Sequence, residues 1–134
     1  MLNPINKALS NKLTASSALV SQLSGGSAVY FPQAPLDAAL PYVVIILAGG
    51  GPENDSPLQS GDVMYYVKGV AETARVAGNI AESIRSALHE QSLSMDSPWT
   101  AYRCQLQEVL MFAENVERRQ FWHAGGSYRI RFSQ

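Results

Sequence analysis

Segments with helical periodicity alternate with segments of strand patterning, and this order constrains the fold more than any other feature of the sequence. Residues 3–23 carry apolar side chains at three- and four-residue spacing, which predicts one helix ended by Gly25 and Gly26. A second helix is predicted from Thr73, a suitable N-cap residue, to Gln91. Its apolar stripe is rich in alanine, which favours close packing against a sheet.

Strand patterning follows each helix. The predicted strands are a short piece at residues 29–31, then residues 42–47 and 63–71, and after the second helix residues 99–113 and 128–133. Residues 42–47 are apolar on both faces, which predicts a central strand covered on both sides. Residues 48–61 are rich in glycine and proline and are predicted to form a long exposed loop, and residues 114–127 a polar connection.

The long strand predicted at residues 99–113 has an irregular pattern. Alternation places five side chains on one face, namely Tyr102, Cys104, Leu106, Leu110 and Phe112. Glu108 interrupts that face, and Val109 and Met111 lie on the opposite one. The interruption permits a β-bulge near Gln107.

These elements define the predicted fold class. A chain of 134 residues fits one domain, here residues 1–134, and the sequence shows no internal repeat. We predict an α+β fold in the order α-β-β-α-β-β. Its sheet is mixed and largely antiparallel, with the two main helices packed on one face.

The composition limits the classes of partner. Charged residues make up 16% of the chain and the net charge is −1, so no overall field favours nucleic acid or an anionic membrane. Such low charge, beside 46% hydrophobic residues, favours a surface partly covered by other proteins. No signal peptide is recognisable, and the longest apolar run, residues 41–48, is too short to span a bilayer. No membrane partner is expected.

The residues that most often carry chemistry do not form a recognisable site. The two histidines, His89 and His123, lack the spacing of a metal site. Cys104 is the sole cysteine and occupies an apolar strand position, which predicts a packed core thiol and excludes an internal disulfide. The glycines at 49–51 lack the Lys-Ser/Thr of a phosphate loop. The sequence therefore predicts no catalytic residue, no cofactor and no metal.

Six side chains are candidates for an interface with a partner: Lys68, Glu72, Arg75, Arg118, Arg119 and Trp122. The first three bracket the junction between the strand at 63–71 and the second helix, where a solvated surface and an ion pair between subunits both remain open. The last three mix basic and aromatic groups. Such mixtures occur at protein interfaces and in single-stranded nucleic-acid sites, and the neighbouring glutamates favour an interface or local salt bridging.

Short motifs distributed along most of the chain resemble one known family. They are the "VY" and "QAP" of residues 26–35, the "LPYVV" of residues 40–44, the segment 70–81 that leads into the second helix, and the closing "YRIR" of residues 128–131. In order and spacing they resemble the tail-completion family of long-tailed phages and prophages, which is similar to tail terminators of the lambda type.

This resemblance implies a structural role in the virion. The chain would form a homo-oligomeric ring, commonly a hexamer, at the head-proximal end of the tail, after assembly in the host cytoplasm. The ring would cap the major tail tube protein, stop tube polymerisation and present the surface that a head-completion or neck protein joins. Duplex DNA would pass through the ring.

Two other readings stay open from the residues. The chain could be a head-side neck or stopper protein of similar size. It could also be a small nucleic-acid-binding module that uses Arg118, Arg119 and Trp122. An enzyme is the weakest option, because no carboxylate is paired with a base or nucleophile in a recognisable spacing.

Overall fold

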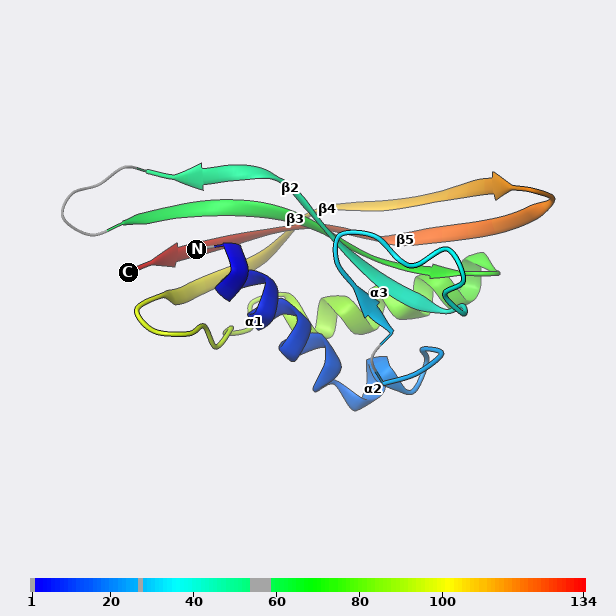
Figure 1. Cartoon of the computed structure of the whole chain (residues 1–134), viewed down its shortest axis with the longest axis horizontal. Coiled ribbons are helices and arrows are strands. Elements are labelled where there is room, and N and C mark those ends of the chain that lie inside the picture. The colour runs from blue at the N-terminus through cyan, green and yellow to red at the C-terminus, as the bar shows by residue number, and fades with distance from the viewer. Residues whose placement is uncertain (1, 27, 54–58) are drawn as a thin grey trace.

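A computed structural model describes residues 2–26, 28–53 and 59–134, in which helices cover one face of a single sheet (Figure 1). The elements are α1 (Leu2–Thr14), α2 (Ser17–Val20), β1 (Val29–Tyr30), β2 (Tyr42–Pro52), β3 (Ser60–Ala71), α3 (Ala74–Leu88), β4 (Thr100–Val116) and β5 (Arg119–Ser133). Within the described ranges no helix is long and apolar enough to cross a membrane.

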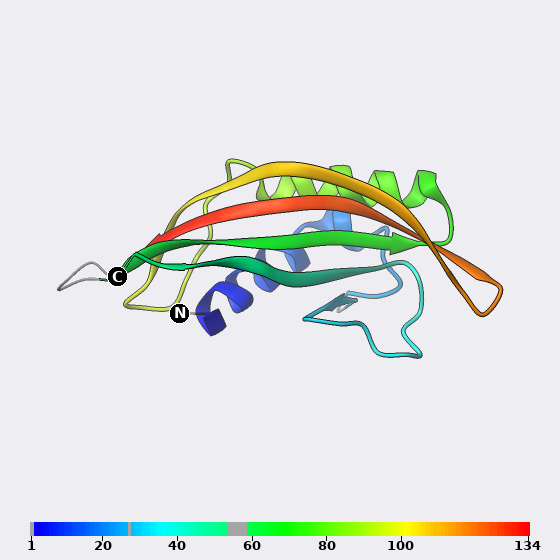
Figure 2. The ribbon, with the colours of Figure 1, turned by 90° about the horizontal axis from the view of Figure 1, so that it is seen from above.

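The sheet has the strand order β1-β2-β3-β5-β4. The short β1 pairs with β2 in parallel, and the other three pairings are antiparallel. Helices α1 and α3 lie on the same face (Figure 1), and the view from above places α3 toward β4 and α1 toward β2 (Figure 2). The predicted α+β class, with a mixed and largely antiparallel sheet, is confirmed.

The core lies between this sheet and the two helices. The face of β3 that carries Val63, Tyr65 and Val67 is buried. It meets the stripes of α1 and α3, which bury Ile5, Leu9, Leu13, Ala77, Ile80, Ile84 and Leu88. The hydroxyl of Tyr65 also donates a hydrogen bond of 2.6 Å to Asn6 Oδ1, which ties α1 to the sheet. Thr73 caps α3 as predicted, since its Oγ1 accepts a bond from the Val76 N–H.

The first helix is shorter than predicted. The sequence predicts one helix over residues 3–23, but α1 ends at Thr14 and a separate turn of helix, α2, ends at Val20. The Thr14 hydroxyl bonds back to the carbonyl of Ser10 at 2.9 Å, and Ser16 caps the start of α2. Side-chain hydroxyls that bond to the local backbone compete with the helix, so the apolar spacing alone overestimated its length.

The described part of the loop predicted at residues 48–61 is mostly strand. β2 continues to Pro52 and β3 begins at Ser60, and part of the predicted loop, residues 54–58, lies outside the described residues. Gly50 has a φ of +98°, and a Cβ added there would lie 2.7 Å from Val63 Cα. The glycines therefore allow a close strand pairing beside a register shift between residues 47 and 49, rather than a turn.

The polar connection predicted at residues 114–127 is a long hairpin. β4 runs on to Val116, and β5 begins at Arg119, so Gly125 and Gly126 lie within a strand. The two turn residues between the strands both have positive φ, which is the conformation of a two-residue hairpin turn. Glu117 and Arg118 occupy these positions, and no Asn-Gly or Asp-Gly signal marked them.

The predicted bulge in β4 is confirmed and it changes the assignment of faces. The register between β4 and β5 shifts between Leu106 and Glu108, so Gln107 is the extra residue. Beyond it Val109 and Met111 pair with residues of the helix-facing side of β5. The prediction that Leu110 and Phe112 share a face with Cys104 and Leu106 is therefore wrong, because one extra residue inverts the alternation that follows.

Candidate assembly surfaces

The β4–β5 hairpin projects beyond the rest of the sheet. The last pairing of β3 with β5 joins Ala71 to Trp122, whereas β4 and β5 remain paired as far as Val116 and Arg119. We call residues 113–121 the hairpin tip. It lies at the same end of the molecule as the start of α3 (Figure 1), so the fold gathers all six candidate interface residues at this end.

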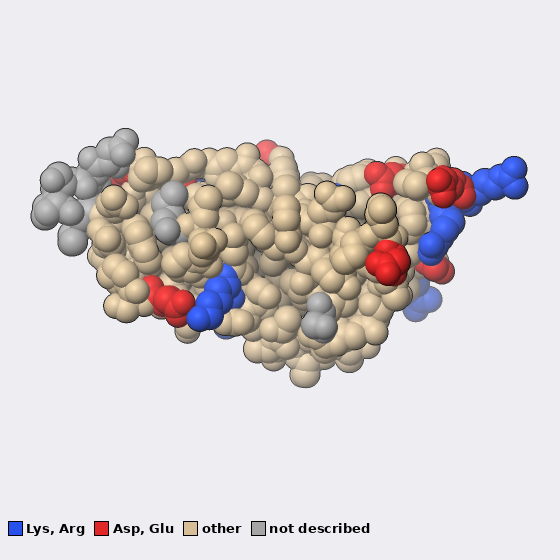
Figure 3. All heavy atoms as spheres, viewed as in Figure 1, with Lys and Arg blue, Asp and Glu red and all other residues tan. Residues whose placement is uncertain are grey.

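Charged groups are concentrated at this end, as the space-filling view shows (Figure 3). Arg119 Nη2 lies 3.5 Å from Glu72 Oε1, and the Arg119 guanidinium lies 5.1 Å from the centre of the Phe121 ring. Both charged side chains are exposed, so the pair contributes little to stability. Arg75 and Arg118 are also exposed and have no ion pair within the described part of the chain.

The other two candidates are less accessible. Trp122 is partly buried and packs against the hydrophobic core, so it is not a free aromatic platform for a stacked base. Lys68 is half-buried on the helix-free face of β3, with its Nζ 5.0 Å from the centre of the Phe112 ring. Burial lowers the pKa of Lys68, and the nearby Glu114 carboxylate acts in the opposite direction.

His123 lies on this helix-free face of β5, near the hairpin tip. Its ring stacks on Phe112 with centroids 4.5 Å apart, and its Nε2 lies 3.4 Å from Glu114 Oε1. The residue is only 8% exposed, and its Nδ1 has no hydrogen-bond partner among the described residues. Burial lowers the pKa of His123, and the Lys68 ammonium lowers it further against the opposing effect of Glu114. The imidazole is therefore neutral at pH 7.

This environment predicts a pH dependence of stability. The folded pKa of His123 lies below its ordinary value of 6.5, so the unfolded chain binds more protons as the pH falls through this value. The free energy of unfolding is expected to decrease as the pH is lowered from 7 toward 5, and His123→Gln is expected to remove this part of the decrease. Urea unfolding at several pH values measures it. A wild-type-minus-variant difference that is constant with pH would contradict the assignment.

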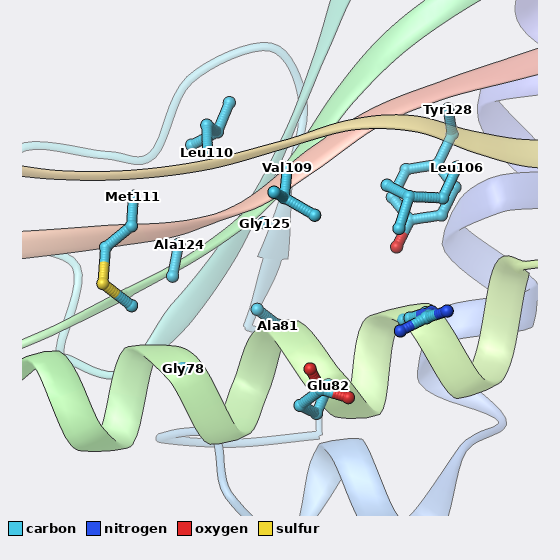
Figure 4. Close-up of a pocket in the computed structure, with 11 residues that line it drawn as sticks. Gly78, Ala81, Glu82, Leu106, Val109, Leu110, Met111, Ala124, Gly125 and Tyr128 are labelled. Atoms are coloured by element: carbon cyan, nitrogen blue, oxygen red, sulfur yellow. The ribbon is translucent and has the colours of Figure 1, made fainter.

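A groove opens between α3 and β4 on the helix-covered side. Its volume is about 340 Å³. Gly78 and Ala81 of α3 form one wall and Val109 and Met111 of β4 the other, while Leu110 leaves β4 on the opposite side (Figure 4). The walls are mostly apolar, and the charged side chains of Glu82 and Arg85, both on α3, also line the groove. The groove is therefore suited to an apolar side chain with a polar or charged neighbour.

The edge of β4 beside this groove is protected over only half of its length. The Glu90 N–H donates to the Cys104 carbonyl at 2.8 Å, and the Leu106 N–H donates to His89 Nδ1 at 3.0 Å. An isolated bridge to Leu93 covers residue 101 as well. From residue 107 to residue 116 the edge has no such cover from the described residues.

The open half of β4 is apolar. Val109 is 78% exposed and Met111 is 53% exposed. A long, unprotected and apolar edge strand is a site for association with another chain unless something blocks it. Sequence reasoning missed this surface because it assigned these two side chains to the wrong face, although the interruption at Glu108 was the available signal.

The residues considered as candidates for catalysis, metal binding or phosphate binding have positions that explain them by packing or backbone structure. Cys104 is buried as predicted, and burial raises the pKa of its thiol to about 12. His89 caps α3 and accepts a backbone hydrogen bond on Nδ1, and the glycines at 49–51 lie in β2. No three His, Cys, Asp or Glu side chains of the described ranges are close enough to share a metal ion.

The open edge of β4 and the projecting hairpin offer surfaces for contacts with other proteins. Residues 7–121 match the model of the family described as "Tail completion protein gp17", and the chain belongs to that family. It is thus a structural assembly protein of phage tails, as the sequence resemblance implied.

Comparison with solved structures shows the same fold in a virus-like particle. A chain of the structure titled "Virion of native gene transfer agent (GTA) particle" superposes with a TM-score of 0.72. The match covers 99% of this chain and 97% of that chain at 16% sequence identity, which shows a common fold. No curated protein sequence matches the chain.

Proposed function

We propose that the chain forms a closed ring on the head-proximal end of the tail tube, ends tube polymerisation and provides the surface that the head joins. The single observation that carries this proposal is that the two edges of the sheet present dissimilar surfaces, here called flanks. One flank carries the open half of β4 and the groove, and the other carries β2 with residues 31–41 (Figure 2). Unlike patches on opposite sides favour head-to-tail association, which yields a ring when the rotation closes.

The composition of the second flank supports a protein contact there. Residues 28–52 contain one charged side chain, Asp37. Away from the hairpin-tip end, the side of the molecule that carries α1, α2 and this segment shows few charged groups apart from the exposed ion pair of Lys7 with Asp96 (Figure 3). Surfaces depleted of charge are typical of the centres of protein interfaces.

In this arrangement the two flanks contact neighbouring subunits of the ring. The two ends of the molecule's long axis therefore remain available for the proteins above and below the ring. The hairpin-tip end carries Lys68, Glu72, Arg75, Arg118 and Arg119. We propose that it contacts either the major tail tube protein or the neck protein. Duplex DNA would pass through the ring. Capping a polymer requires complementary surfaces and no catalysis, so the proposed role is not enzymatic.

The test is the tail phenotype of particles made without this chain. Overlong tails that fail to join heads are expected. Expression of the wild-type chain from a second copy of its gene should restore a uniform tail length. Tail length is measured by electron microscopy of purified particles. Tails of normal length in the absence of the chain would contradict the terminator role.

Tails produced in cells that make no heads separate this role from that of a head-side neck protein. A terminator should co-purify with such tails and appear at one end of each tube. A chain that is absent from headless tails and present on heads would be a neck or stopper protein instead.

A further inference from the structure

We infer that the groove between α3 and β4 receives Leu36 of a second copy of this chain, with Asp37 of that copy placed beside Arg85. The inference rests on the proposed function, because it names the contact that would join neighbouring subunits of the ring. Leu36, which the fold leaves outside the core, is then the side chain that fills the groove of the neighbouring subunit.

Leu36 is presented to solvent by a defined turn. The side chain is fully exposed, and the Ala38 N–H donates a hydrogen bond of 3.0 Å to the Pro35 carbonyl. This bond closes a turn in which Leu36 and Asp37 are the two central residues. Proline before the leucine restricts the backbone further, so little conformational freedom remains to be lost when the leucine enters a pocket.

The groove matches this turn in chemistry. Its walls, formed by small residues of α3 and by Val109 and Met111, suit a branched aliphatic side chain. It is also lined by Arg85, which has no ion pair within the described ranges. Asp37, the sole charge in residues 28–52, would meet this guanidinium, while Glu82 one turn away disfavours the reverse orientation.

The positions of the two surfaces fit a repeated contact. In the view from above, residues 31–41 project from the flank beside β2, and α3 with β4 forms the opposite flank (Figure 2). Both features lie along the same part of the long axis (Figure 2). Subunits placed side by side would therefore bring the turn of one copy toward the groove of the next, and each copy would use both surfaces once.

Cysteine cross-linking tests the occupant directly. In the double variant Leu36→Cys with Val109→Cys, mild oxidation is expected to give a ladder of covalent oligomers, up to a closed species. Each single variant is the matched control and should give at most a dimer. The native Cys104 thiol is buried and has a pKa of about 12, so it does not interfere. The reaction is run on the purified chain across its soluble concentration range and on chain bound to tail tubes.

The ladder supports the inference, and its absence in both settings overturns it. Capture of the tube protein by the Val109→Cys variant, without a bond to residue 36, would mean that a different partner fills the groove, and this also overturns it.

Charge reversal gives a second and independent readout. Asp37→Arg and Arg85→Asp should each weaken ring formation, and the combination should restore it. Leu36→Ser should weaken association by roughly tenfold to a hundredfold, as loss of one buried leucine predicts, whereas Leu2→Ser on α1 is the matched control. Association is measured by sedimentation equilibrium.

These outcomes separate the inference from the function on which it rests. Wild-type rings that persist unchanged in Leu36→Ser and in both charge reversals would overturn the groove contact and leave the ring proposal intact. A wild-type chain that neither forms rings nor caps tubes would refute the proposed function itself.

Discussion

Gly125→Ala is expected to lower the free energy of unfolding by about 3 kcal/mol or more. Gly125 lies in β5 opposite Lys68 of β3, in the middle of the sheet. A Cβ at this position would lie 2.6 Å from Lys68 Cα and would also meet the Val67 carbonyl oxygen. Both obstacles are backbone atoms of a paired central strand, so no side-chain rotation relieves the clash. Urea unfolding monitored by tryptophan fluorescence measures the change.

Gly78→Ala is the matched control for this prediction. Gly78 lies within α3, and a Cβ there would make an ordinary contact with Met111 Cε at 3.6 Å. Alanine is favoured over glycine inside a helix by roughly 0.5–1 kcal/mol, so this variant should be slightly more stable than the wild type. Equal and small effects of the two substitutions would show that β3 and β5 are not as closely paired at Gly125 as described.

Phe132→Ala is expected to cost about 3–5 kcal/mol of stability. The Phe132 side chain is fully buried, and its ring meets Trp99 edge-to-face with centroids 5.7 Å apart. It lies between Gly61 of β3 and Ala101 of β4 in the sheet register, where small neighbours leave no side chain able to fill the space. Removing the ring therefore leaves a cavity and detaches Trp99 from the core.

Tyr102→Ala is the control on the neighbouring strand. Tyr102 is an exposed aromatic residue at the same end of β4, and its removal should change the stability by about 0.5 kcal/mol or less. Thermal and urea unfolding of both variants give the comparison. A loss below about 1 kcal/mol for Phe132→Ala would mean that this end of the core repacks far more readily than large-to-small substitutions usually allow.

Local chemistry was sufficient to predict several elements. Thr73 has the hydroxyl of an N-cap and precedes an amphipathic stretch, and the structure confirms both the cap and the helix. The strand predicted at residues 63–71 lies within β3. In these segments one face is strongly apolar, so the local pattern and the tertiary environment agree.

Glycine positions misled the prediction because glycine has two uses. The glycines at 49–51 were interpreted as part of a loop and those at 125–126 fell within a predicted polar connection, whereas they lie within β2 and β5. A missing Cβ serves a tight turn and a close strand approach equally well, and only the identity of the neighbouring strand distinguishes them. The true turn, at Glu117 and Arg118, contains no glycine.

The sequence named the candidate interface residues in two separate groups, which stay a prediction. The structure brings both groups to one end of the molecule and adds that Glu72 pairs with Arg119 within the same subunit. The groove and the open half of β4 were not predicted, since they depend on a bulge, on the packing of α3 and on which edge residues are capped. Each of these is a relation between segments distant in sequence.

The sequence by itself determined the order of the main elements, the apolar face of α3 and, through its motifs, the family, because apolar periodicity and capping are properties of adjacent residues. The tertiary structure decided where strands end, which face Val109 occupies, and that Leu36 remains outside the core on the flank opposite the groove. These features arise from pairing and burial between distant segments, and the free energy of such contacts is not contained in any local pattern.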